Sequence, residues 1–243
     1  MIEKFEVTGI VLSNMPIGEY DKRVVILSKE FGKMSAFARG ARKANSPFLA
    51  GSQPMAFGTF TLYQGRNSYS ITNIKVSDYF SNDLTDPDHM YMAMYFLELA
   101  DYYAKEGLDA KEMLALIYVA MKALVKGQIP LTLIRRIFEF KMLVINGEYP
   151  DVFACGRCGS KENLDYFDLT HDCFVCEKCH ETIPEDKKIK SSTLYALQYI
   201  VTSPMNKLFA FNVKDDILAQ LDEVIGSYIK KKVDKHFNSL DFL

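Results

Sequence analysis

The 243-residue sequence lacks a stretch long and apolar enough to cross a membrane. Its longest apolar run covers the nine residues 113–121, whereas a membrane-spanning helix needs about 20. The first residues, MIEKFE, also lack the apolar core of a secretory signal peptide. We therefore expect a soluble, cytoplasmic protein that makes no contact with a membrane.

Recognisable catalytic motifs are missing as well. The chain has no Walker loop, no GxSxG and no HExxH, which would place a phosphate cradle, a nucleophile or zinc ligands at fixed spacing. The four histidines are scattered along the chain: His89, His171, His180 and His236. The sequence therefore predicts a protein that is not an enzyme.

A strong excess of one charge is also absent, because the net charge is −2. Residues 1–80 nevertheless carry 10 Lys and Arg against 6 Asp and Glu, while residues 81–154 carry 7 against 11. A polyanion would therefore bind to the N-terminal third. Ordinary scatter of surface charge is the alternative explanation.

The first 80 residues have the pattern of short strands. Five segments rich in β-branched and aromatic residues are separated by turn residues: 5–12, 23–28, 33–39, 55–63 and 69–76. Five short strands without a helix favour a small closed barrel, of which the OB-fold is the commonest form and an SH3-like barrel the alternative. We predict an OB-type barrel domain over 1–80.

Helical periodicity begins after residue 80. Asp86 and Pro87 are typical of a helix start, and Gly107 and Gly127 of helix ends. The expected helices cover about 87–106, 110–126, 130–146, 192–202 and 213–236. We predict a helical bundle over 81–154 and 181–243, interrupted by an insertion at 155–180, and hence an α+β fold.

The insertion contains all five cysteines. Cys155 and Cys158 form one Cys-x-x-Cys pair, and the second pair is either Cys173 with Cys176 or Cys176 with Cys179. The latter leaves 17 residues between the pairs, within the range typical of four-cysteine zinc sites. We predict a structural zinc ribbon, with one zinc per chain, in which Cys155, Cys158, Cys176 and Cys179 are the ligands.

Alternatives to this assignment are a redox dithiol, chance clustering, and a histidine, His171 or His180, in place of one cysteine. Four thiolates would leave no position for a catalytic water.

The segment GKMSAFARGARKANSPF, residues 32–48, contains a basic loop. Arg39, Arg42 and Lys43 surround Gly40, which permits a close approach of a phosphate backbone. We predict that these three residues bind DNA, with Lys33 and Arg23 as weaker candidates. A solvated charged loop is the alternative. Some barrel aromatics could stack on bases, although core packing explains most of them: Phe37, Phe57, Phe60, Tyr63 and Tyr69.

Three segments together resemble the RecO family of bacterial DNA-repair mediators. They are GIVLSNMPIGEYDKRVVILSKEFGKMSAFARGARKANSPF, RRIFEFKMLVINGEYPDVFACGRCG and HFNSLDFL, in this order. Family members with a zinc site often have a Gly-Gly turn before the second cysteine pair, where this chain has Asp172-Cys173. This departure supports placing Cys173 outside the ligand set.

The resemblance implies an OB barrel, a helical bundle and an inserted zinc ribbon. It also implies binding of single- and double-stranded DNA, annealing of complementary strands coated with single-stranded-DNA-binding protein, and loading of RecA together with RecR. RecF is a further candidate partner. For the acidic tail of single-stranded-DNA-binding protein we predict a site at Arg135 and Arg136. The rival hypotheses are a zinc-containing transcription regulator and a nucleic-acid-processing enzyme.

Overall fold

The structure is a computed structural model of the chain, and it describes all residues except 1–3, 67 and 181–186. Contacts divide the chain into two compact units, Met1–Lys126 with Phe237–Leu243, and Gly127–His236. This grouping differs from the three-part domain division predicted from the sequence, which stays a prediction. The predicted boundary at residue 181 lies outside the described residues. No described helix has the length and apolar character that crossing a membrane requires.

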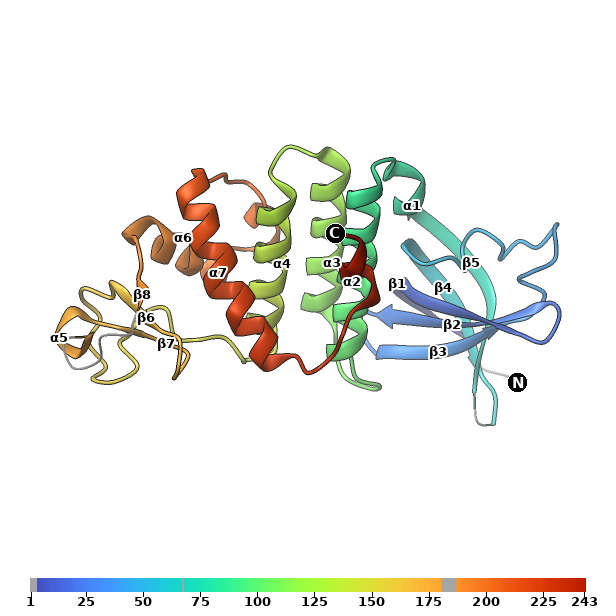
Figure 1. Cartoon of the computed structure of the whole chain (residues 1–243). Helices are drawn as coiled ribbons and strands as arrows, with labels where there is room; N and C mark the ends of the chain where they lie inside the picture. The colour runs from blue at the N-terminus through green and yellow to red at the C-terminus, as the bar shows by residue number, and fades with distance from the viewer. Residues whose placement is uncertain (1–3, 67, 181–186) are drawn as a thin grey trace. The chain divides into compact units, whose positions relative to one another are not determined.

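The first unit contains a closed five-stranded barrel with the strand order β1-β2-β3-β5-β4 (Figure 1). The strands are β1 (Lys4–Ile17), β2 (Asp21–Ser28), β3 (Gly32–Ala38), β4 (Ala56–Gln64) and β5 (Tyr69–Tyr79). Neighbours are antiparallel except β3 and β5. The predicted OB-type barrel is thus confirmed. Strand β1 is longer than expected, because residues 13–17 pair with the start of β2.

The alternation of side chains along β3 shows how the sequence builds this barrel. Met34, Ala36 and Ala38 are buried, whereas Lys33, Ser35 and Phe37 point to the outer face, as expected for a half-buried strand. The inward side chains of the strands form one apolar core, which includes Val7, Val11, Val24, Ile26, Phe60, Leu62 and Ile71.

Helices α1 (Phe80–Asp83), α2 (Pro87–Tyr103) and α3 (Lys111–Lys126) complete the first unit with the C-terminal 3₁₀ helix η2 (Asn238–Phe242). Asp86 caps α2 as predicted, because its carboxylate accepts hydrogen bonds from two backbone N–H groups of the first turn. The chain end packs on α2: Ser239 donates a 2.7 Å hydrogen bond to Glu98, and Phe242 stacks on Tyr91.

The second unit consists of three long helices and the cysteine-containing segment. Helices α4 (Leu131–Ile145), α6 (Ser191–Thr202) and α7 (Asp215–Lys232) pack on one another, and the 3₁₀ helix η1 (Met205–Lys207) follows α6. The short strands β6 (Tyr166–Asp168), β7 (Cys173–Val175) and β8 (Lys187–Lys188) form a three-stranded sheet with β6 in the centre, and helix α5 (Glu177–His180) follows β7. The ribbon-like hairpin between the two cysteine pairs is therefore present.

Candidate functional site

The basic loop follows β3 and folds back on the turn between β1 and β2. Gly40 has a left-handed backbone, with φ of 68°, and its N–H donates a 2.7 Å hydrogen bond to the carboxylate of Asp21. The N–H of Arg42 donates to the carbonyl of Tyr20, and its guanidinium to the carbonyl of Gly18 at 3.0 Å. These hydrogen bonds fix the backbone of the loop. They therefore also fix the backbone positions from which its cationic side chains extend.

Arg39, Arg42 and Lys43 are exposed. Within the part of the chain that the structure describes, none of the three forms an ion pair. The Lys43 ammonium lies 5.2 Å from the centre of the Tyr20 ring, a cation–π contact. Their positive charges therefore remain available to a polyanion.

Lys22 is a fourth cation of this region, and sequence reasoning missed it. Only 7% of its surface is exposed, and its ammonium lies 3.3 Å from the hydroxyl of Ser52. Burial, and then the charge of Arg42, lower the pKa of Lys22. The alternation of side chains along β2 would predict that Lys22 points inward. It would not reveal that the loop containing Ser52 covers Lys22.

The two weaker candidates lie on the outer face of the barrel. The Arg23 guanidinium donates a 2.7 Å hydrogen bond to Ser35, and Arg23 pairs in register with Phe37, two residues before the basic loop. The Lys33 ammonium lies 2.8 Å from the carbonyl and 3.3 Å from the carboxylate of Asp101 on α2. Lys33 thus holds α2 against the barrel, whereas Arg23 extends the cationic surface of the loop.

The four predicted metal ligands are brought together in the second unit. The sulfur atoms of Cys155, Cys158, Cys176 and Cys179 all lie within 4.8 Å of one another. Each pair belongs to a tight turn, in which the N–H of Gly159 donates to the carbonyl of Cys155, and that of Cys179 to the carbonyl of Cys176. Four sulfurs in two such turns form a site that could hold a metal ion.

The protonation of these thiols also favours a cation among them. Burial raises the pKa of Cys155, but hydrogen bonds from the backbone N–H groups of Cys176, Cys158 and Arg157 outweigh burial and lower it to about 6. The pKa of Cys179 is raised to about 12 by its hydrogen bond with Cys158 and by burial. Four neighbouring thiolates repel one another, and a bound cation would stabilise them together.

A buried ion pair supports the cysteine site from the hairpin. Asp168 on β6 contacts the Arg157 guanidinium, which also donates a 3.0 Å hydrogen bond to the carbonyl of Cys179. Burial raises the pKa of Asp168, but hydrogen bonds from the His171 backbone and from Arg157 outweigh burial and lower it. Arg157 thus ties the first cysteine turn to the second.

Cys173 and the two nearby histidines lie outside the four-sulfur group. Cys173 is on β7 and packs on Gly156, where an added Cβ would come within 2.6 Å of the Cys173 Cβ. His171 is largely exposed and contacts Asp168, while the His180 ring stacks on Tyr166. The geometry therefore agrees with the predicted choice of four cysteines. The preceding turn residue, Asp172, has a φ of 54°, which explains why a glycine would suit it.

Comparison with known proteins identifies relatives along nearly the whole chain. The family models for "Recombination protein O N terminal" and "Recombination protein O C terminal" match residues 1–80 and 84–241. The chain belongs to the RecO family. It is 32% identical over 238 residues to the DNA repair protein RecO of Acetivibrio thermocellus, covering 97% of this chain and 94% of that protein.

Two further relatives carry the same name. DNA repair protein RecO of Bacillus subtilis is 31% identical over 252 residues, covering 100% of this chain and 94% of that protein. DNA repair protein RecO of Alkaliphilus metalliredigens is 30% identical over 235 residues, covering 96% of each. RecO family membership supports a role in DNA repair.

The arginines predicted to bind a partner have structural contacts within the helical unit of this RecO family member. Arg136 is 8% exposed, and its guanidinium lies 2.5 Å from Glu139 and 2.7 Å from Asp222 on α7. Arg135 also pairs with Glu139, at 2.9 Å. The guanidinium of Arg136 packs on Gly226, where an added Cβ would come within 2.9 Å. Arg136 therefore joins α4 to α7, and a partner site here stays a prediction.

Replacing Glu139 by alanine should destabilise the helical unit. Glu139 is fully buried, and its removal would leave the guanidinium of Arg136 with one carboxylate fewer. Leaving a buried charge without a partner costs about 3–5 kcal/mol, and we expect a smaller loss here because Asp222 still pairs with Arg136. Urea unfolding followed by circular dichroism should show a clear loss for Glu139→Ala and almost none for Glu162→Ala, which changes an exposed residue of the same unit. Equal stability of the two variants would contradict the structural role of this network.

Proposed function

We propose that this protein is a mediator of DNA repair and homologous recombination that binds single- and double-stranded DNA. It anneals complementary strands, including those coated with single-stranded-DNA-binding protein, and promotes RecA loading with RecR. The observation that carries the proposal is the exposed cluster Arg39, Arg42 and Lys43, which has no acidic partner among the described residues of an OB-type barrel.

The mechanism follows from the kind of contact that such a cluster makes. Cations on phosphates release counterions and hold a strand without reading its sequence. A strand held in this way can shift until its complement pairs with it. Such a reaction needs no bond-making residue, in agreement with the absence of a recognised catalytic motif in the sequence.

The remaining assignments extend this proposal. The protein acts in the cytoplasm, its partners are RecR and single-stranded-DNA-binding protein, and it has a functional link to RecA. For the acidic tail of single-stranded-DNA-binding protein we retain Arg135 and Arg136 as the predicted site. The tail would have to compete with Glu139 and Asp222 for these guanidinium groups.

The metal at the four cysteines is proposed to be one structural zinc ion. Zinc prefers four thiolates at tetrahedral corners, and the two turns supply two sulfurs each. Bound zinc would stabilise the thiolate forms of Cys155, Cys158, Cys176 and Cys179 and thereby join the two turns of the ribbon.

The DNA proposal predicts the salt dependence of binding. Replacing Arg39, Arg42 and Lys43 together by alanine should reduce the slope of log affinity for single strands against log salt by about 2, since each lost contact removes about 0.7. Fluorescence anisotropy over a range of salt concentrations measures the slope. A control with the exposed Lys111, Lys126 and Lys230 replaced by alanine should keep the wild-type slope. An unchanged slope in the first variant would move the DNA site elsewhere.

The metal proposal separates two cysteines that lie six residues apart. Metal analysis after gel filtration should find about one zinc per chain in the wild type and in Cys173→Ser. Cys179→Ser should lose most of the zinc, because three thiolates bind it less tightly. Full zinc retention by Cys179→Ser, or its loss from Cys173→Ser, would refute the ligand assignment.

The annealing proposal is tested with complementary strands coated with single-stranded-DNA-binding protein. The wild-type protein should accelerate duplex formation, measured by energy transfer between labelled strands. The Arg39, Arg42 and Lys43 triple variant should accelerate it much less, and the Lys111, Lys126 and Lys230 control should match the wild type. Duplex formation at the rate without protein would rule out the annealing role.

A further inference from the structure

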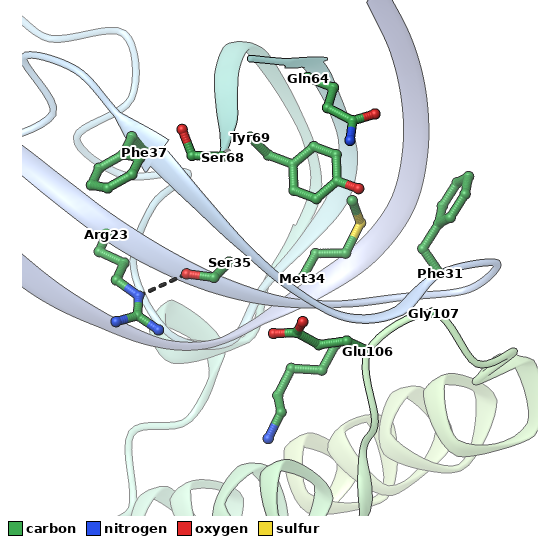
Figure 2. A pocket seen from close by; sticks show the side chains of 11 residues that line it. Arg23, Phe31, Met34, Ser35, Phe37, Gln64, Ser68, Tyr69, Glu106 and Gly107 are labelled. Carbon is green, nitrogen blue, oxygen red and sulfur yellow. Dashed lines mark hydrogen bonds between the residues drawn. The ribbon is translucent and has the colours of Figure 1, made fainter. Parts of the chain in front are cut away.

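A cavity of about 490 Å³ lies beside strand β3 of the barrel (Figure 2). It is lined by Arg23, Phe31, Lys33, Met34, Ser35, Phe37, Gln64, Ser68, Tyr69, Glu106 and Gly107. All of these residues belong to the first compact unit. The volume lies within the range of small-molecule pockets, about 300–1,000 Å³.

The cavity exists because the barrel closes through a short seam. Among the described residues, strands β3 and β5 pair at two positions, Ala36 with Tyr69 and Phe37 with Ser70. Three residues before the first of these pairs on β3, the N–H of Lys33 donates a hydrogen bond to the carbonyl of Lys105, in the loop between α2 and α3. The seam and this loop therefore leave room beside β3 for a ligand.

Aromatic rings in this cavity are held in place by other contacts. The ring of Phe5 makes edge-on contacts with Phe31, at 5.6 Å, and with Tyr69, at 5.9 Å between ring centres. The backbone carbonyl of Phe31 accepts a 2.9 Å hydrogen bond from Gly107. Phe31 nevertheless remains 43% exposed, so its ring offers a face to a ligand without first having to be ordered.

The polar groups of the cavity indicate what kind of ligand it takes. Gln64 and Ser68 offer neutral donors and acceptors, and the charges are mixed, because the carboxylate of Glu106 lines the cavity together with the cations of Arg23 and Lys33. Figure 2 shows the side chains of Gln64 and Tyr69 above Met34, with Phe31 at one end and Phe37 at the other. Flat apolar rings with mixed hydrogen-bonding groups suit a nucleobase better than an anion.

Phosphate-binding positions lie close to this cavity along β3. Phe37 points outward next to Arg23 in the strand register, and Arg39 follows two residues later, about 7 Å along an extended chain. A DNA strand whose phosphates contact the basic loop can therefore turn a neighbouring base toward the aromatic rings of the cavity.

We propose that this cavity accepts an unpaired nucleobase of single-stranded DNA, which stacks on Phe31 or Phe37. The inference rests on the proposed DNA-binding function and adds to it a contact that paired bases cannot make. Stacking is available to every base, so the site tolerates sequence. It favours single strands over duplexes, because the bases of a duplex are already stacked and paired.

The test compares oligothymidylate with an abasic strand of equal length in fluorescence anisotropy. The wild-type protein should bind the base-bearing strand about tenfold more tightly, the contribution expected from one stacked base. The double variant Phe31→Leu with Phe37→Leu keeps apolar side chains but loses two rings, and it should show little preference. Its salt slope should equal that of the wild type, because the basic loop is unchanged.

Tyr195→Leu removes an exposed ring from α6 and serves as the matched control, which should keep the wild-type preference. Equal affinity of the wild-type protein for the two strands would overturn the proposed base-binding site. This outcome needs no variant and therefore does not depend on whether a variant folds. A double variant with an undiminished preference would overturn it as well. Failure of both strands to bind, in contrast, would reject the DNA-binding proposal itself.

Discussion

Closure of the barrel depends on a close approach of backbones at two facing glycines. Gly9 on β1 pairs with Gly58 on β4, and a Cβ would lie 2.4 Å from the carbonyl of Leu27 at the first position and 2.2 Å from that of Lys75 at the second. No side chain fits at these distances. Because glycine stands at both positions, β1 and β4 can bend sharply enough for five strands to close.

The closed barrel determines what the outer face of β3 presents. Once β3 pairs with both β2 and β5, its outward side chains form a single row of Lys33, Ser35 and Phe37, which leads to Arg39. The short seam with β5 opens the cavity beside this row. The cationic loop and the aromatic cavity are therefore two consequences of the same strand arrangement, and a strand of DNA could contact both.

Local patterns in the sequence were sufficient for the elements and for the cysteine pairs. Segments rich in β-branched and aromatic residues between turn residues predicted the strands, Asp86 with Pro87 predicted the start of α2, and the 17-residue spacing predicted the four cysteines that cluster. Contacts between distant residues could not be predicted in this way. Lys33 meets Asp101, 68 residues away, and Arg136 meets Asp222, 86 residues away. For the barrel aromatics, alternation alone did not separate Phe60, in the core, from Phe37, on the cavity.

Net charge is a poor guide to where this protein can bind a polyanion. A cation that pairs with a carboxylate attracts a polyanion less than an unpaired cation does. Lys122 pairs with Asp78, and Lys190 pairs with Asp216, so their fields are largely cancelled nearby. No such partner among the described residues neutralises Arg39, Arg42 and Lys43. A chain with a net charge of −2 can therefore present one loop of unpaired cations that attracts a phosphate backbone, and a DNA strand bound there would lie beside the cavity lined by Phe31 and Phe37.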